Sequence, residues 1–146
     1  LSEWQITIPE MGTIIAKEKP YVILTSNRTR ELSEAIRRRC IFLWLDYPGF
    51  EKELQILQKK VPDCDINLTK QICNFMLLIR KQKLEKIPGI AETIDWAKSL
   101  VALHQDHLDP AMVEATLGIV FKDRDDLDYV RSSLKDLIDS VDEKMI

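Results

Sequence analysis

The residues best suited to chemistry lie in one stretch, from Thr25 to Cys40, with the sequence TSNRTRELSEAIRRRC. Asn27 directly follows an apolar run typical of a buried strand, so its amide is expected at the carboxyl end of that strand. In open α/β sheets ligands bind at this edge. An amide there can donate to a phosphate oxygen or orient a water molecule. The alternative for Asn27 is a turn residue that tolerates a left-handed backbone.

Five of the eight arginines of the chain fall in the same stretch, and three of them are consecutive. Arg37, Arg38 and Arg39 are expected at the end of a short helix, just before another apolar run. Cations suit the carboxyl end of a helix dipole, so a solvated charge run is one interpretation. The other is a guanidinium presented to a phosphate, whose oxygens fit the planar fork better than they fit an ammonium.

The residue spacing does not support a phosphate-binding loop, a metal site or a cysteine pair. The four glycines are far apart, so neither a GxxxxGK[ST] phosphate loop nor a GxGxxG motif is present. His104 and His107 lie three residues apart but are expected to be solvated residues near a helix end rather than metal ligands. The three cysteines form no CxxC pair, which favours a reduced, cytoplasmic setting.

Composition narrows the class of protein. The 146 residues are 45% hydrophobic and 31% charged, which is typical of a folded chain of one domain or two small ones. A net charge of -3 argues against a sequence-wide nucleic-acid binder. No apolar run approaches the roughly 18 residues that span a bilayer, and the first residues lack a signal-peptide pattern. We expect no membrane segment, and we expect the chain to be a piece of a longer protein.

The first part of the chain, residues 1–48, has the pattern of an α/β layer. Two β-branched runs, Ile6–Ile8 and Thr13–Ile15, predict a hairpin with its turn at a glycine. Residues 21–25 and 41–45 are continuously apolar, which predicts strands buried on both faces of a sheet. A short helix is expected between them, over residues 31–39, with a serine at position 33 as its N-cap.

Helical spacing of apolar residues predicts an all-α bundle over residues 49–146. Proline and glycine separate the segments, and Asp109-Pro110 has the pattern of an N-cap followed by the first helical residue. Trp96 falls on an apolar stripe and is expected in the core. The five predicted helices cover residues 50–61, 66–79, 90–101, 110–120 and 125–138.

Three blocks of sequence, ITIPEMGTI, VILTSNRTRELSEAIRRRC and PGIAETIDWA, together resemble the MoxR family of AAA+ ATPases. Within this family the accessory ATPases associated with carbon monoxide dehydrogenase maturation are most similar. The resemblance covers nearly the whole chain, and SNRTRELSEAIRRRC is its specific part. It implies the C-terminal part of an αβα nucleotide-binding core, with a pre-sensor 1 hairpin, followed by a helical lid.

The resemblance also assigns roles to single residues. Asn27 matches the sensor 1 residue, which helps to position the water that attacks the γ-phosphate. Arg39 matches the arginine finger that reaches a neighbouring subunit's nucleotide, with Arg38 as the second choice. Residues 5–15 match the hairpin that faces a central pore or a substrate. The position of the sensor 2 arginine holds Glu92, which cannot donate to a phosphate when ionised and suits the first turn of a helix.

For the intact protein the resemblance implies ATP and Mg²⁺ as cofactors, a homo-oligomeric ring, expected to be a hexamer, and a client protein such as a metalloenzyme. The phosphate loop and the Walker B acids are expected before Leu1, so this stretch alone should neither hydrolyse ATP nor bind it tightly. Two alternatives are a clamp-loader or helicase module that acts on nucleic acid and a helical protein-interaction module. Net acidity and the lack of aromatic residues between the arginines weigh against the first alternative.

Overall fold

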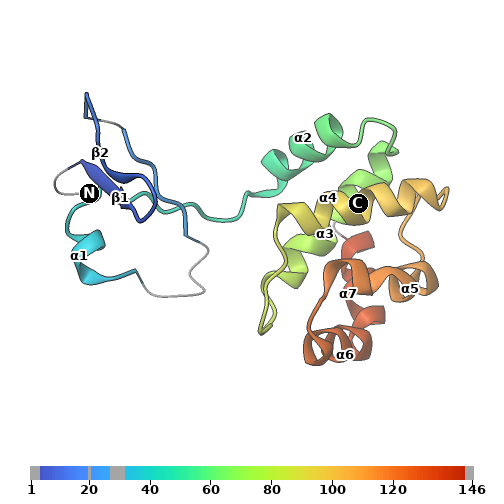
Figure 1. Ribbon diagram of the computed structural model, residues 1–146. Helices are drawn as coiled ribbons and strands as arrows, with labels where there is room; N and C mark the ends of the chain where they lie inside the picture. The colour runs from blue at the N-terminus through green and yellow to red at the C-terminus, as the bar shows by residue number, and fades with distance from the viewer. Residues whose placement is uncertain (1–3, 20, 27–31, 144–146) are drawn as a thin grey trace. The chain divides into compact units, whose positions relative to one another are not determined.

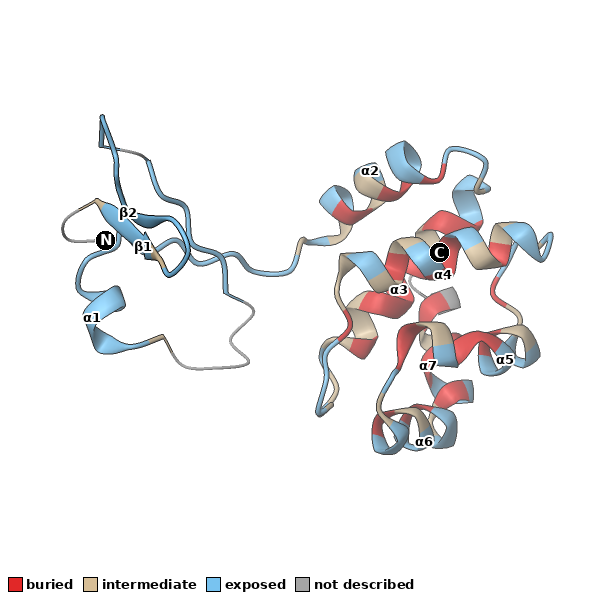
Figure 2. Cartoon of the chain, viewed as in Figure 1, coloured by how far each residue is buried: buried red, intermediate tan, exposed pale blue. Residues whose placement is uncertain are grey.

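The computed structural model describes residues 4–19, 21–26 and 32–143, and it divides between Trp44 and Leu45 into two compact units. Figure 1 shows a hairpin and a short helix in the first unit and a bundle of helices in the second. The two units differ in how many of their residues are buried. Figure 2 shows that all of the buried residues belong to the helical unit, and no described residue before Leu45 is buried.

The hairpin is confirmed. Strands β1 (Gln5–Ile8) and β2 (Gly12–Ile15) pair in antiparallel register, with Thr7 opposite Thr13. The hydroxyls of these two threonines lie 2.9 Å apart, a cross-strand contact of the kind that stabilises a sheet. Gly12 has a φ of 78°, a left-handed conformation that glycine adopts without a steric penalty, so a glycine is needed where the turn returns to β2.

The helix predicted between the two apolar runs is present but shorter than expected. Helix α1 covers Glu34–Arg37 and has Ser33 at its N-cap, as predicted, although the serine side chain makes no capping hydrogen bond. Glu34 lies in the first turn and Arg37 in the last, which is the favourable arrangement for the helix dipole.

The two strands predicted over residues 21–25 and 41–45 are absent, so this part of the prediction is wrong for the chain as it stands. The apolar side chains of these runs are exposed, and Tyr21 and Ile41 have their full surface accessible. A continuous apolar run becomes a buried strand only when other strands pair with its backbone and other layers cover both faces. Among the residues described in this unit, only β1 and β2 pair with each other.

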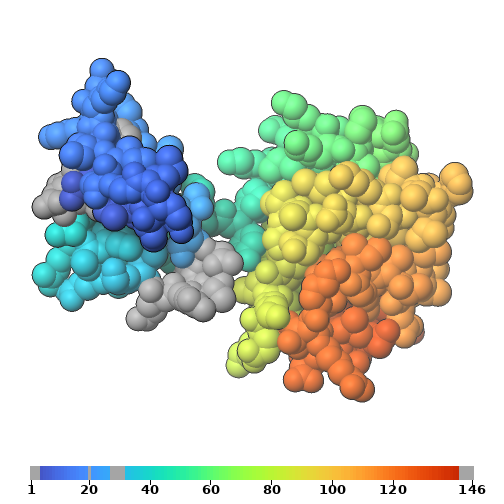
Figure 3. All heavy atoms as spheres, in the orientation of Figure 1, coloured from blue at the N-terminus to red at the C-terminus, as the bar shows by residue number. Residues whose placement is uncertain are grey.

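The described part of the helical unit contains six helices, and in the space-filling view residues after about position 50 form one continuous body (Figure 3). Helix α3 packs against α2, α4 and α7, and nine of its residues are buried. The elements are α2 (Phe50–Lys60), α3 (Ile66–Ile79), α4 (Ile90–Ala102), α5 (Pro110–Val120), α6 (Arg124–Ser132) and α7 (Leu134–Glu143).

Aspartate caps define where three of these helices begin. Asp65 accepts a hydrogen bond from Asn67 N at 2.7 Å, ahead of α3. Asp109 accepts one from Met112 N at 3.0 Å, ahead of α5, which confirms the predicted cap and the proline at the first helical position. Asp123 caps α6 in the same way. Each carboxylate satisfies an amide that the helix itself leaves unpaired.

The predicted fifth helix is wrong in one respect, because the structure has two helices where the sequence predicted one. The break lies at Ser133, whose φ of -111° and ψ of 9° leave the helical region. Ser132 and Ser133 both donate their hydroxyls to Tyr129 O, at 2.7 and 3.3 Å. Serine hydroxyls compete in this way with the helix for backbone acceptors, and an apolar periodicity does not reveal it.

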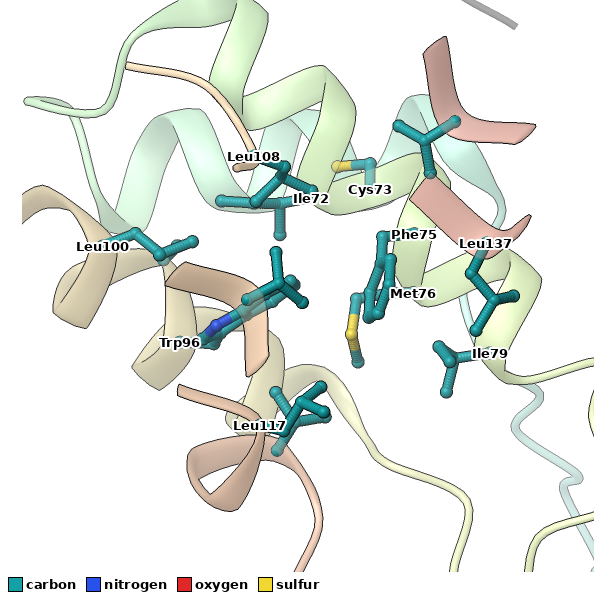
Figure 4. Close-up of a cluster of buried hydrophobic side chains, with 14 of the residues drawn as sticks. Ile72, Cys73, Phe75, Met76, Ile79, Trp96, Leu100, Leu108, Leu117 and Leu137 are labelled. Carbon is teal, nitrogen blue, oxygen red and sulfur yellow. The ribbon is translucent and has the colours of Figure 1, made fainter. Parts of the chain in front are cut away.

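The core of the helical unit surrounds Trp96, which is fully buried as predicted (Figure 4). Its ring lies 5.2 Å from that of Phe75, centroid to centroid, in a tilted arrangement favourable for aromatic pairs. The indole Nε1 donates to the hydroxyl of Thr116 at 2.9 Å, which joins α4 to α5. A buried N–H therefore has its acceptor, and α5 is fixed relative to the aromatic core.

Replacing Thr116 by valine should destabilise the protein by about 1–3 kcal/mol, because the buried indole N–H would lose its acceptor while the side-chain volume stays nearly the same. The measurement is the free energy of urea unfolding, followed by circular dichroism. Ser99→Ala is the control, since its hydroxyl donates only to Asp95 O, and it should change stability by less than about 0.5 kcal/mol. Equal effects of the two substitutions would contradict the assignment.

Candidate functional site

The residues that the sequence singled out do not come together in one described site. Asn27, predicted to contact a water or a phosphate, lies outside the described residues. Arg38 and Arg39 lie just beyond the end of α1, and both are exposed. The amide of Arg39 donates to Ile36 O at 3.0 Å, so its backbone continues the last turn of the helix.

The two arginines differ in their partners. The guanidinium of Arg38 forms an ion pair with Glu34, one turn earlier on the same helix. No ion pair involves Arg39 among the residues that the structure describes. Of these two exposed guanidiniums, that of Arg39 therefore lacks a counter-ion among the described residues, whereas that of Arg38 shares a solvent-exposed, weak pair with Glu34.

Glu92, at the sensor 2 position, caps its own helix. Its Oε2 accepts a hydrogen bond from Gly89 N at 2.9 Å, where α4 begins. A Cβ at Gly89 would lie 3.1 Å from that same oxygen, so the cap fits closely against the glycine. The carboxylate thus stabilises the first turn of α4 and supplies no donor for a phosphate.

The most tightly built polar cluster in the described chain was not predicted from the sequence. Arg80, at the end of α3, forms a bidentate ion pair with Glu53 of α2, with Nη1–Oε2 and Nη2–Oε1 distances of 2.5 and 2.8 Å. The two side chains are 6% and 0% exposed. Planar, parallel hydrogen bonds of this kind are the strongest geometry for such a pair.

Three further residues contact this ion pair. The hydroxyl of Thr93, on α4, accepts from Arg80 Nη2 at 3.1 Å and lies 3.0 Å from Glu53 Oε1. Arg80 Nε donates to Pro88 O at 3.0 Å. The ring of Tyr47 lies over the guanidinium, 5.1 Å from its Cζ to the ring centroid. Because carboxylate and guanidinium are occupied by each other and by these neighbours, the cluster joins helices rather than binding a ligand.

One signal in the sequence could have revealed this cluster. Glu53 falls three residues after Phe50 and four before Leu57, on the same stripe as the apolar residues of α2. A charged residue on a buried stripe requires a partner of opposite charge. The sequence does not say which of its 21 basic residues supplies that partner, because Arg80 lies 27 residues further along.

Two other buried polar side chains hold loops in place. Asp126 accepts hydrogen bonds from the amides of Glu85 and Lys86, at 2.8 and 2.9 Å, and thereby fixes the loop before α4 to α6. Gln71 Oε1 accepts from Leu108 N at 2.9 Å, which fixes the loop before α5 to α3. Both side chains are buried and have backbone amides as hydrogen-bond partners, as buried polar groups usually do.

The two cysteines of the helical unit are not predisposed to react. Burial raises the pKa of Cys73 to about 12, and burial also raises the pKa of Cys64. In both residues the protonated thiol is therefore favoured over the nucleophilic thiolate. A hydrogen bond from His107 lowers the pKa of the exposed Asp106. No group of three or more histidine, cysteine, aspartate or glutamate side chains in the described parts of the chain is arranged to hold a metal ion.

No protein-family model, no curated protein and no solved structure matches this chain. Among residues 4–19, 21–26 and 32–143, no helix has both the length and the apolar character required to cross a membrane.

Replacing Glu53 by alanine should destabilise the protein by about 3–5 kcal/mol, because it leaves the guanidinium of Arg80 buried without its counter-ion. The measurement is the free energy of urea unfolding. Asp128→Ala is the matched control: it removes a carboxylate on the surface of α6 that lies 3.8 Å from Arg131, and it should cost less than about 1 kcal/mol. The pair would have no special role if both substitutions cost the same.

The cysteines should react in the order of their exposure. At pH 8 a thiol with a pKa of about 12 is thiolate in about one molecule in 10⁴, so Cys73 should not react with a disulfide reagent in the folded protein. The exposed Cys40 should react first, and Cys40→Ser should remove this fast phase. Mass spectrometry locates the label, and labelling of Cys73 before unfolding would contradict the burial described here.

Proposed function

We propose that this chain is part of a MoxR-like AAA+ ATPase, a cytoplasmic protein that assembles into a homo-oligomeric ring and uses ATP hydrolysis to remodel or mature a client enzyme. The observation that carries the proposal is the block SNRTRELSEAIRRRC, whose last arginine is exposed and has no ion pair in the described chain. ATP and Mg²⁺ would bind to the intact protein, with the phosphate loop supplied by residues outside this chain.

Arg39 has the properties required of an arginine finger. Its backbone continues the last turn of α1, its side chain is exposed, and its neighbour Arg38 is the one engaged by Glu34. A finger acts by placing a permanent positive charge against the γ-phosphate held by an adjacent subunit. A guanidinium already paired within its own subunit would have to break that pair first, so Arg39 is the better candidate.

The exposed apolar runs of the first unit support its membership in a larger sheet. Residues 21–24 and 41–45 expose large hydrophobic side chains, including those of Ile23 and Leu43, which are 89% and 78% exposed. Soluble proteins seldom expose such continuous apolar surface. In the proposed nucleotide-binding core these runs are strands, covered by neighbouring strands and helices. Asn27 then follows the first of them, at the edge where a sensor 1 residue orients the attacking water.

In this proposal the helical unit is the lid over the nucleotide. Glu92 occupies the sensor 2 position but already caps α4 through Gly89 N. A lid of this kind closes over the nucleotide without contributing a cation from that position. Hydrolysis would then depend on charges from the core and from Arg39 of the neighbouring subunit.

A second candidate is a helical protein-interaction module, and one observation favours it. Every buried residue of the described chain lies in the helical unit, so this unit has a core of its own. In that case Arg37 to Arg39 would be a solvated charge run, and no nucleotide would be involved. The experiment on Arg39 distinguishes the two candidates.

In the intact protein, Arg39→Ala should lower ATP turnover by about 10³-fold or more and leave ATP binding nearly unchanged, because a finger acts on the transition state. The adjacent Arg38→Ala is the matched control, since it removes only the exposed pair with Glu34, and it should retain most of the turnover. Turnover is measured with saturating ATP and Mg²⁺, and affinity by titration with a nucleotide analogue.

Action in trans is tested by mixing subunits. Arg39→Ala subunits keep an intact phosphate loop, and subunits disabled in the phosphate loop keep Arg39. ATP turnover should therefore return at interfaces where the phosphate loop of the first faces Arg39 of the second. No recovery in mixtures that demonstrably co-assemble would contradict a finger in trans. If the intact protein shows no ATP turnover at all, the ATPase proposal fails and the interaction module is favoured.

A further inference from the structure

Three consecutive carbonyl groups just before α4 are each within hydrogen-bond distance of a side chain from a different part of the helical unit. The hydroxyl of Tyr47 donates to Ile87 O at 3.3 Å. Arg80 Nε donates to Pro88 O at 3.0 Å. The hydroxyl of Thr93 lies 3.1 Å from Gly89 O. The chain that enters α4 is therefore held residue by residue.

The three side chains that hold these carbonyls also contact one another. The ring of Tyr47 lies over the guanidinium of Arg80, and Arg80 Nη2 donates to the hydroxyl of Thr93. Glu53 joins them by pairing with Arg80 and lying 3.0 Å from Thr93 Oγ1. A continuous set of polar contacts thus runs from the segment before α2 to the first turn of α4.

Tyr47 is the weakest member of this set. Its side chain is 51% exposed, so it contributes little to the hydrophobic core. Its contacts are one long hydrogen bond and one cation–π contact, both of which are modest at a partly exposed site. The ion pair between Arg80 and Glu53, in contrast, is almost fully buried and costly to open. Tyr47 is therefore held less firmly than the ion pair that it covers.

We propose that Tyr47, Arg80 and Thr93 form a latch that couples the segment Leu45–Gly49 to the start of α4. When Tyr47 is in place, its ring shields one face of the guanidinium and its hydroxyl holds Ile87. When it leaves, Arg80 gains contact with water, and the anchoring of Pro88 and Thr93 weakens. The latch goes beyond the proposed ATPase activity and does not depend on it, because all of its members lie within the helical unit.

The test is amide hydrogen exchange at the start of α4, measured by NMR on the full 146-residue chain. The reporters are Gly89 N, which donates to Glu92, and Thr93 N, which donates to Gly89 O. Tyr47→Ala should speed exchange at both by at least about tenfold, since local opening becomes easier. Tyr47→Phe keeps the ring over Arg80 and loses only the bond to Ile87, so it should give a smaller increase, about threefold.

The matched control is Tyr129→Ala. Tyr129 is similarly exposed, and its hydroxyl donates to Gln82 Oε1 in the same loop, but the structure gives it no contact with Arg80. It should leave exchange at Gly89 and Thr93 unchanged. Unchanged exchange at these amides in Tyr47→Ala overturns the latch. An equal increase at core amides such as that of Leu100 also overturns it, since it would mean general destabilisation.

Coupling must also act in the reverse direction. Thr93→Val removes the hydroxyl that Arg80 contacts and leaves Tyr47 unaltered. With 3-fluorotyrosine incorporated, the ¹⁹F resonance of Tyr47 should shift or broaden in this variant, while that of Tyr129 stays in place. A Tyr47 resonance identical to that of the parent chain would show that the two ends are not coupled and would overturn the proposal.

Discussion

The buried ion pair between Glu53 and Arg80 is the interaction on which the helical unit most depends. It joins α2 to the end of α3 and, through Thr93, to α4. Because both charges are removed from water, the loss of either partner leaves an uncompensated ion in the core. The bidentate geometry also fixes direction, since the planar fork matches a carboxylate in only a few orientations. The first three helices of the bundle are therefore held in one arrangement.

The other buried polar side chains of the helical unit also have hydrogen-bond partners. Trp96 donates to Thr116, Gln71 holds the backbone at Leu108, and Asp126 holds the loop before α4. In the described part of the unit, no buried side-chain nitrogen or oxygen lacks a hydrogen-bond partner. The first unit contrasts with this, because its apolar runs are exposed and find no covering layer. That difference is why we place its function in a larger assembly.

Local signals in the sequence were enough to predict much of the fold. Apolar periodicity located the helices between residues 50 and 120, Asp109-Pro110 gave the start of α5, and Gly12 gave the hairpin turn. Contacts between residues far apart in the sequence could not be predicted in the same way. Residues 21–25 and 41–45 have a strand composition, but pairing depends on neighbours that no single run specifies. Arg80 is likewise one basic residue among many until the fold brings it to Glu53, and the proposed role of Asn27 concerns a residue outside the described chain.

The most direct test is the rate at which one proton, the Nε–H of Arg80, exchanges with water in the full chain. In the structure it donates to Pro88 O at 3.0 Å within a side chain that is 6% exposed. Its NMR signal should therefore exchange with water at least about a hundredfold more slowly than the Nε–H signals of exposed arginines such as Arg39 and Arg124, because exchange requires the cluster to open. An Arg80 Nε–H that exchanges as fast as those of the exposed arginines would contradict the buried pair and the arrangement of helices built on it.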